Sequence, residues 1–175
     1  HESGVVRVLD HELGTCSREG LARSIAYLPQ ERAVQWPMLV HRIVALGRLP
    51  YGARDTGAAA VEDAMARCDV LQFASRRLNE LSAGERARVL LARALATQAP
   101  ILLVDEPAAH LDPAHQLRLM ELLRAEAARG VAVAITLHDL SLASRFCDEI
   151  VVLQNGHVAG QGVPGDVLSD AALAQ

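Results

Sequence analysis

The chain has 175 residues, of which 51% are hydrophobic and 3% aromatic, and its formal net charge is −4. A chain of this length can bury the core of one domain, or of one domain with an inserted lobe. The negative net charge gives no electrostatic reason to expect a nucleic-acid partner, which would favour a basic surface. No apolar stretch approaches the roughly eighteen residues of a membrane span, so any association with a membrane is expected to be peripheral.

The first part of the chain reads as short strands and helices followed by a helical insertion. A strand is expected at 5–9, a polar turn at 10–12, a brief helix at 17–22 and a strand at 25–28. From residue 31 to residue 80 the pattern becomes helical and rich in alanine and arginine. This segment is predicted to be a helical subdomain inserted into a core of residues 1–30 and 81–175.

Helices and strands alternate in the rest of the chain. Helices are expected at 83–97, 113–128 and 139–147, and strands at 101–104 and 131–137. Such alternation predicts a parallel, doubly wound α/β sheet. The segment 150–158 reads as a hairpin, because Asn155-Gly156 supplies the positive φ angles of a tight turn, and a short helix is expected after Gly165.

Two adjacent carboxylates, Asp105 and Glu106, directly follow the apolar run 101–104. In nucleotide-hydrolysing α/β sheets, ligands bind outside the carboxyl ends of the strands, where a magnesium ligand stands beside a general base. Taken alone, the two acids could equally be turn or cap residues at the end of a strand. The motifs before and after these two acids favour the catalytic interpretation.

The segment Leu81-Ser-Ala-Gly-Glu85 predicts the start of a helix, since Ser82 and Glu85 have the spacing of a capping box. That structural role is one interpretation. In the other, Gly84 leaves the helix N-terminus open, so that backbone amides, the Ser82 hydroxyl and the positive end of the helix dipole can meet a phosphate.

Three more polar residues have both a structural and a functional interpretation. Asp112 precedes Pro113 and is a good N-cap for the helix that follows. His138 ends the second apolar strand, and Gln30 follows the strand at 25–28. Either side chain could serve as an ordinary local hydrogen-bonding group, so position alone does not assign a function.

The order of these elements resembles the ATP-binding cassette (ABC) ATPases, over essentially the whole chain. The resemblance implies a P-loop NTPase-like sheet with an inserted α-helical subdomain, and ATP and Mg²⁺ as cofactors. Asp105 would order Mg²⁺, mainly through water, and Glu106 would be the general base for the attacking water. His138 would be the second catalytic residue, the switch histidine that touches the γ-phosphate. Gln30 matches the Q-loop glutamine, which could reach Mg²⁺ and sense bound nucleotide.

The same resemblance implies nucleotide contacts at two further motifs. Ser82, Ala83, Gly84 and Glu85 match the signature Leu-Ser-Gly-Gly-Gln, which contacts the γ-phosphate of ATP held by the partner subunit. Ala83 and Glu85 depart from that pattern. The segment Ala109-His-Leu-Asp112 matches the D-loop, which crosses the dimer interface and links the two ATP sites, although a histidine replaces the usual small residue.

The phosphate-binding loop of this family, Walker A (G-x-x-x-x-G-K-[ST]), requires a lysine, and all 17 basic residues of this chain are arginine. The chain also begins with His1 rather than Met. We therefore expect an N-terminally truncated cassette in which the Walker A loop, its helix and the N-terminal strands are absent. The 175-residue chain alone is expected to be inactive, whereas the full-length protein hydrolyses ATP. A non-catalytic fragment is the alternative.

The stretch 43–51 resembles the ATPases of importers for iron-siderophore, haem or cobalamin, and Trp36, Met38 and Leu39 lie where such ATPases receive a coupling helix. The resemblance implies the ATPase subunit of a bacterial ABC importer, peripheral on the cytoplasmic face of the inner membrane. The implied partners are a second ATPase subunit in a head-to-tail dimer, integral membrane permease subunits and, indirectly, a substrate-binding protein. A soluble, non-transport ABC ATPase of DNA repair or translation is the alternative, disfavoured because the inserted segment is too short for a long coiled coil.

Overall fold

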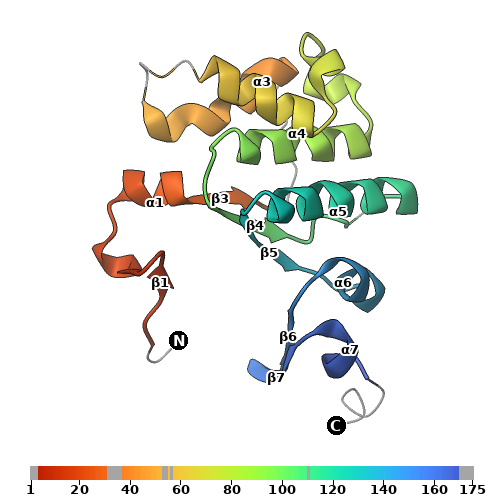
Figure 1. The fold of residues 1–175 in the computed structure, drawn as a ribbon. Helices are drawn as coiled ribbons and strands as arrows, with labels where there is room; N and C mark the ends of the chain where they lie inside the picture. Colours follow the sequence, from red (N-terminus) through yellow and green to blue (C-terminus); the bar gives the residue numbers. More distant parts are fainter. Residues whose placement is uncertain (1–3, 31–36, 53–54, 56, 110, 170–175) are drawn as a thin grey trace.

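The computed structural model describes residues 4–30, 37–52, 55, 57–109 and 111–169 and extends from a helical end to a β-hairpin end (Figure 1). In chain order, the elements outside the inserted segment are β1 (Arg7–Val8), β2 (His11–Glu12), the 3₁₀ turn Leu13–Thr15, α1 (Arg18–Ser24), β3 (Ile25–Leu28), α4 (Ala83–Leu95), β4 (Ile101–Asp105), α5 (Pro113–Ala128), β5 (Ala132–Thr136), α6 (Leu140–Phe146), β6 (Ile150–Gln154), β7 (His157–Gly162) and α7 (Pro164–Val167). The inserted segment contributes α2 (Val40–Ala45), α3 (Ala58–Arg67) and the 3₁₀ turns Leu46–Tyr51, Leu71–Phe73 and Leu78–Glu80. No helix in the described part of the chain is long and apolar enough to cross a membrane.

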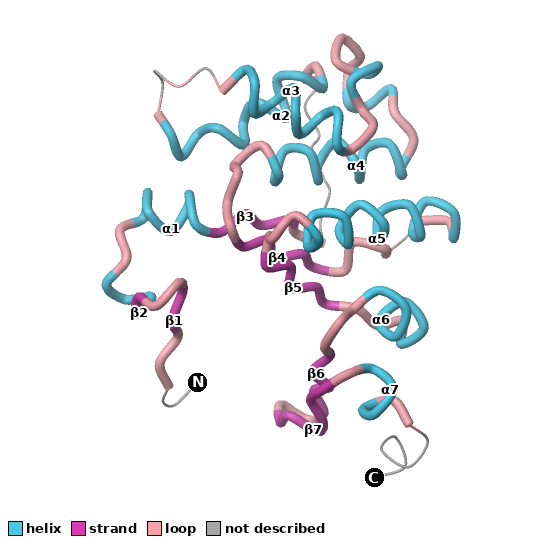
Figure 2. Tube along the Cα trace, viewed as in Figure 1, coloured by secondary structure: helices cyan, strands magenta, loops and turns pink. Residues whose placement is uncertain are grey.

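Three parallel strands form the central sheet, in the order β3-β4-β5 (Figure 2). The register pairs Leu28 with Val104 and Asp105 with Thr136, so the three strands end at one edge of the sheet. The predicted parallel α/β sheet is therefore confirmed. Residues that follow these strands reach the same edge although they lie far apart in the sequence.

One face of the sheet carries the core. Ala26, Leu28, Leu102 and Val104 alternate along β3 and β4, and each is at most 6% exposed. They pack in a single cluster with buried residues of α4, α5 and the inserted helices. The opposite face carries Tyr27, which is 53% exposed, because successive side chains of a strand point to opposite faces.

The N-terminal segment differs from the prediction. Instead of one strand at 5–9, Arg7–Val8 pairs with His11–Glu12 in an antiparallel hairpin. Leu9 and Asp10 form its turn with φ angles of 46° and 64°. The predicted strand is therefore wrong, because Leu9 adopts a left-handed conformation that its side chain does not favour and that the sequence does not signal. The following helix is confirmed.

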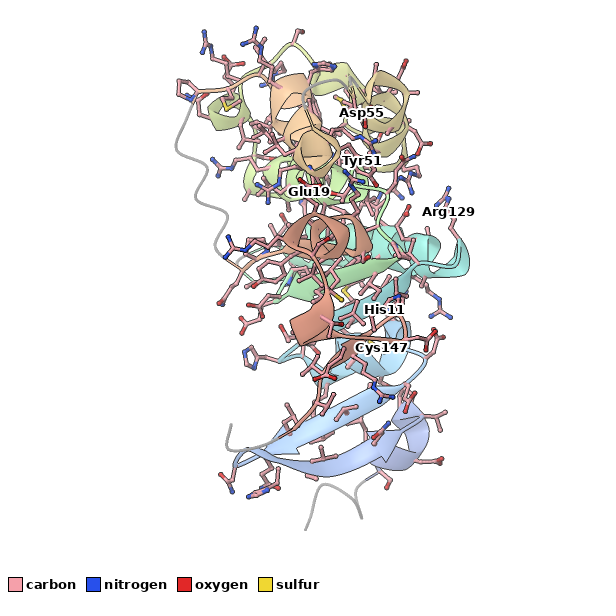
Figure 3. The ribbon with its side chains drawn as sticks, turned by 90° about the vertical axis from the view of Figure 1, so that its left-hand side faces the viewer. His11, Glu19, Tyr51, Asp55, Arg129 and Cys147 are labelled. Carbon is pink, nitrogen blue, oxygen red and sulfur yellow. The ribbon has the colours of Figure 1, made fainter. Side chains whose placement is uncertain are left out.

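The 3₁₀ turn of the inserted segment is tied to the C-terminal end of α4. The Arg48 guanidinium stacks on the Tyr51 ring, 3.7 Å from its centroid, and donates to Ala96 O and to Gln98 Oε1, both at 3.0 Å. Arg48 also pairs with Asp55, which lies near Tyr51 at the helical end of the molecule (Figure 3). The hydrogen bond from Arg48 lowers the pKa of the Asp55 carboxyl. In this chain, the stretch that resembles importer ATPases thus anchors the inserted helices.

Two predictions about the inserted segment remain predictions. Trp36 lies outside the described residues, so the expected receiving groove is described only at Met38, which packs against the core, and at Leu39, which is 37% exposed. The domain boundaries at residues 30 and 80 are likewise untested, since the inserted helices and the sheet share one hydrophobic cluster.

The β6–β7 hairpin forms a sheet of its own, with Asn155 and Gly156 in its turn at φ angles of 51° and 79°, as predicted. A groove of about 920 Å³ lies between β5 and β6 and is also lined by α5 and α6. Leu153 and Val158 face each other across the hairpin and are 70% and 61% exposed. The described residues thus leave apolar side chains of the hairpin open.

Candidate active site

Polar side chains at the carboxyl edge of the sheet converge on Glu106. Its Oε2 accepts a hydrogen bond from Gln30 Nε2 at 2.7 Å, and its Oε1 lies 2.6 Å from His138 Nε2. Gln30 follows β3, Glu106 follows β4 and His138 follows β5. The parallel sheet therefore brings together three of the residues to which the sequence points.

The backbone of Glu106 lies in a conformation that residues with a side chain rarely adopt. Its φ is 42°, in the left-handed region. Its amide donates to Thr136 Oγ1 at 3.0 Å. Backbone positions of this kind gather at functional sites, where they aim a side chain. Here the turn directs the carboxylate, 23% exposed, towards Gln30, which follows one flanking strand, and His138, which follows the other.

Asp105 is held by a hydroxyl of the neighbouring strand. Thr136 Oγ1 donates to Asp105 Oδ1 at 2.6 Å, and the two residues are register partners. The Tyr27 hydroxyl lies 3.5 Å from Asp105 Oδ2, at the outer limit of a hydrogen bond. Thr136 thus connects both acids, because it donates to the carboxylate of one and accepts from the amide of the other.

The sequence did not point to Thr136 or Tyr27. Thr136 reads as an ordinary β-branched strand residue, and Tyr27 as a strand aromatic. One signal was available: in a parallel sheet, the last residues of adjacent strands lie side by side. A hydroxyl at the end of β5 could therefore have been matched to Asp105, but only with the register known.

A cavity of about 160 Å³ opens beside Glu106 and His138. Its walls also include Ala108 and Gln116. Gln116 donates from Nε2 to Ala108 O at 3.1 Å and to Leu111 O at 2.9 Å, and so holds the turn between Glu106 and α5. Gln116 is a further site residue that the sequence did not reveal, since an amide in the first turn of a helix has many ordinary roles.

The start of α4 has the predicted capping box. Ser82 Oγ accepts from the Glu85 amide at 3.3 Å, and Glu85 Oε2 accepts from the Ser82 amide at 2.7 Å. The hydrogen bond from the Ser82 amide is the main reason that the pKa of Glu85 is lowered. The structural interpretation is confirmed and accounts for both side chains. The phosphate contact expected of Ser82, Ala83, Gly84 and Glu85 remains a prediction.

Asp112 is the N-cap of α5, as predicted. Its Oδ1 accepts from the His115 amide at 3.1 Å, and its Oδ2 lies 2.7 Å from His115 Nδ1. The hydrogen bond from the His115 amide is the main cause that lowers the pKa of Asp112. The His115 ring also covers Gly84, which the sequence did not indicate. The D-loop role of Asp112 remains a prediction, and residue 110 lies outside the described residues.

The candidate residues therefore form two groups. Gln30, Asp105, Glu106 and His138 gather at the sheet edge, whereas the segment 82–85 gathers with Asp112 at the starts of α4 and α5. In the described part of the chain, no hydrogen bond or ion pair joins Ser82, Glu85 or Asp112 directly to the first group. The structure does not bring the two groups into one site.

Asp105 and Gln30 suit a hydrated Mg²⁺ ion. Within the described residues, no group of three or more His, Cys, Asp or Glu side chains could hold a metal by itself. Mg²⁺ usually keeps several waters and binds through one or two carboxylates together with substrate phosphates. Asp105 fits this pattern because, among the described residues, its Oδ2 makes only the long contact to the Tyr27 hydroxyl at 3.5 Å, and an amide oxygen of Gln30 can add a ligand.

Comparisons with known proteins identify the family of the chain. The family model for ABC transporters matches residues 1–109. A hemin import ATP-binding protein of Rhodococcus jostii is 43% identical over 99% of the chain, which spans 60% of that relative. A cobalamin import ATP-binding protein of Halobacterium salinarum is 46% identical over 95% of the chain, which spans 43% of that relative. A hemin import ATP-binding protein of Pseudomonas entomophila is 41% identical, with 98% of the chain and 69% of the relative covered.

Solved structures share the fold. The cbiO1 protein of Clostridium perfringens, part of an ABC transporter complex, matches with a TM-score of 0.85 and 26% identity, over 98% of this chain and 70% of that one. A dimeric ATP-binding cassette bound to ADP and phosphate matches with a TM-score of 0.75 and 24% identity, over 93% of this chain and 74% of that one, which shows the fold alone. The chain therefore belongs to the ABC transporter family, among its ATP-binding cassettes.

Proposed function

We propose that this chain forms part of the ATP-hydrolysing subunit of a bacterial ABC importer, with Glu106 as the general base. The observation that carries the proposal is the convergence of Gln30 and His138 on the Glu106 carboxylate. Asp105, together with Gln30, would hold a hydrated Mg²⁺. When bound, Mg²⁺ would neutralise charge on the β- and γ-phosphates of ATP.

In the group at the sheet edge, Glu106 acts on the attacking water and His138 acts on the γ-phosphate. Glu106 accepts a hydrogen bond from the water and takes its proton. Each of its carboxylate oxygens already has one partner, Gln30 or His138, and keeps a second lone pair that can accept a hydrogen bond from the water. His138 is 84% exposed and is free to turn towards the phosphate, where a ring N–H stabilises the transferred group.

The second group of residues supports a head-to-tail dimer. In the described part of the chain, the segment 82–85 and Asp112 make no direct hydrogen bond to Asp105 or Glu106. In the head-to-tail arrangement that the family resemblance implies, they would act on the nucleotide of a partner subunit. The first turn of the 13-residue helix α4 offers backbone amides and the positive end of its dipole to a phosphate. Permease subunits would hold the dimer peripherally at the cytoplasmic face of the inner membrane, and a substrate-binding protein would act indirectly.

The substrate class follows from the relatives and from one segment of the sequence. The relatives are named hemin and cobalamin import proteins, and the stretch 43–51 resembles the ATPases of such importers. We assign the chain to the importers of iron-siderophore, haem or cobalamin. The permease and the binding protein select the cargo, so the ATPase residues do not distinguish among the three.

Glu106→Gln in the full-length protein tests the assigned chemistry. General base catalysis contributes about 10²–10⁴-fold, so we expect ATP hydrolysis to fall at least about a hundredfold while ATP is still bound. Phosphate release and binding of labelled ATP measure the two quantities. Glu121→Gln is the matched control, because this exposed acid of α5 pairs with Arg118 away from the site and should leave the rate unchanged. Near-normal hydrolysis by Glu106→Gln would remove Glu106 from its role.

Import is tested in cells that carry only the Glu106→Gln protein. These cells should lose ATP-dependent uptake of labelled haem, cobalamin or a ferric siderophore. Unchanged uptake of all three would contradict the importer assignment. Copurification of the wild-type protein with ribosomes or DNA, instead of membrane permeases, would favour the soluble class.

A further inference from the structure

The imidazole of His115 lies directly against the backbone of Gly84. A Cβ atom built on Gly84 would come within 3.0 Å of Cδ2, Cγ and Nε2 of the ring, so a side chain at this position cannot coexist with the ring as it stands. Gly84 is buried and is the second residue of α4. With the ring in this position only a glycine fits at residue 84, and this holds independently of any phosphate.

Asp112 holds His115 through two hydrogen bonds, one from its backbone amide and one from its ring. The His115 amide donates to Asp112 Oδ1 at 3.1 Å, and the ring Nδ1 lies 2.7 Å from Asp112 Oδ2. A carboxylate is an acceptor only, so Nδ1 carries the proton that it donates. With Nδ1 directed at Asp112, the opposite side of the ring, with Cδ2 and Nε2, lies over Gly84.

His115 thus joins two segments that the hydrogen bonds of the backbone leave separate. Asp112 is the N-cap of α5, and Gly84 lies in the first turn of α4. The ring is held by one hydrogen bond, from Nδ1, on one side and lies against the backbone of Gly84 on the other. Because the ring is held to Asp112 and lies against Gly84, a shift of Asp112 displaces the ring relative to the first turn of α4.

We propose that His115 is a positioning residue that holds the turn 82–85 at a set distance from Asp112, so that both face a partner subunit as one rigid surface. The proposal rests on the function proposed above, in which these two segments act on the partner's nucleotide. His115 itself touches neither nucleotide nor reacting atoms. Its loss should impair the step that needs the assembled dimer and should spare binding of ATP by the separate subunits.

His115→Ala in the full-length protein tests this role through kcat and ATP affinity separately. Misplacement of a catalytic surface by about 1 Å costs up to about a hundredfold in rate, so we expect kcat to fall about ten- to a hundredfold. The Kd for ATP, measured with dilute subunits, should stay unchanged. His115→Asn, whose amide can replace Nδ1 as the donor to Asp112, is the second variant and guards against simple misfolding. His157→Ala is the matched control, since this exposed histidine of β7 lies outside both groups.

Gly84→Ala, alone and combined with His115→Ala, tests the contact itself. The added methyl group should lower the melting temperature and kcat in the presence of the ring, and it should cost clearly less when the ring has been removed. Equal effects of Gly84→Ala in both backgrounds, or full kcat in His115→Ala, would overturn the proposal. A wild-type protein with no ATPase activity would instead overturn the proposed function, and the melting temperatures would still decide whether His115 and Gly84 interact.

Discussion

Thr136 positions two acids with one hydroxyl group. It donates to Asp105 Oδ1 and accepts from the Glu106 amide. A hydroxyl has one proton and two lone pairs, so both hydrogen bonds can exist together. Without this group the carboxylate and the amide each lose a partner, and the left-handed turn at Glu106 loses its tie to β5.

We expect Thr136→Val to lower kcat for ATP hydrolysis about tenfold or more, because the general base is no longer held in place. Valine has nearly the same shape and suits a strand, so β5 should remain intact. Thr136→Ser retains the hydroxyl and should retain most of the activity. Phosphate release by the two full-length variants measures the effect, and their melting temperatures check the fold. Equal activity of the two variants would contradict the positioning role.

Among the elements, the inserted helices depend on a close crossing with α4. Gly47 is buried, and a Cβ atom there would overlap the backbone oxygen of Arg93 and lie 3.1 Å from Ala96 Cβ. At the same crossing, Thr97 Oγ1 donates to Gly47 O at 3.1 Å, and the Tyr51 hydroxyl donates to Thr97 O at 2.8 Å. The close contact at Gly47 and the two hydrogen bonds therefore all hold the 3₁₀ turn Leu46–Tyr51 against the C-terminal end of α4.

We expect Gly47→Ala to lower the free energy of unfolding by about 1–3 kcal/mol, as overpacking of a core does. The obstructing atom belongs to the backbone of α4, so it cannot move aside as a side chain would. Gly165→Ala is the control, because a Cβ atom at that position would meet no heavy atom within 4 Å. Urea unfolding of the full-length Gly47→Ala and Gly165→Ala proteins measures the two free energies of unfolding. A Gly47→Ala midpoint equal to that of the control would show that α4 and the inserted segment can separate without cost.

At the scale of the whole molecule, the core contains an ionisable group that links stability to pH. Cys68 follows α3 and is fully buried, and this burial raises the pKa of its thiol from 9.0 to about 12. Between these values the unfolded thiol loses its proton whereas the folded one keeps it. The native state then binds more protons, so the free energy of unfolding falls as the pH rises.

The contribution of Cys68 is therefore complete below pH 9 and is lost progressively from pH 9 towards pH 12. The slope from this one group reaches about 1.4 kcal/mol per pH unit at most. We expect Cys68→Ala to flatten the alkaline decline in stability, although the cavity lowers stability at neutral pH. Urea unfolding at pH 7 to 10.5 measures how the free energy of unfolding of the full-length wild-type and Cys68→Ala proteins changes with pH. The partly exposed Cys16 provides the control, and the same flattening in Cys16→Ala would contradict the assignment to Cys68.

Elements with local signals at their ends were predictable. The helix α5 begins at Pro113 after its cap Asp112 and ends at Ala128, as expected, because cap, proline and a following glycine all lie in the sequence. The β6–β7 hairpin follows from its Asn155-Gly156 turn in the same way. The first strand was not predictable, since the turn at Leu9 contradicts the preference of that residue.

The sequence by itself determined the order and type of most elements, the pair of acids at the end of β4, and both helix caps. These features depend on residues within a few positions of one another, where propensity and spacing act directly. Only the tertiary structure decided that Gln30 and His138 meet at Glu106, that Thr136 supports both acids, and that His115 covers Gly84. These contacts depend on the register of parallel strands and on the distance between two helix starts, which packing sets and local sequence does not.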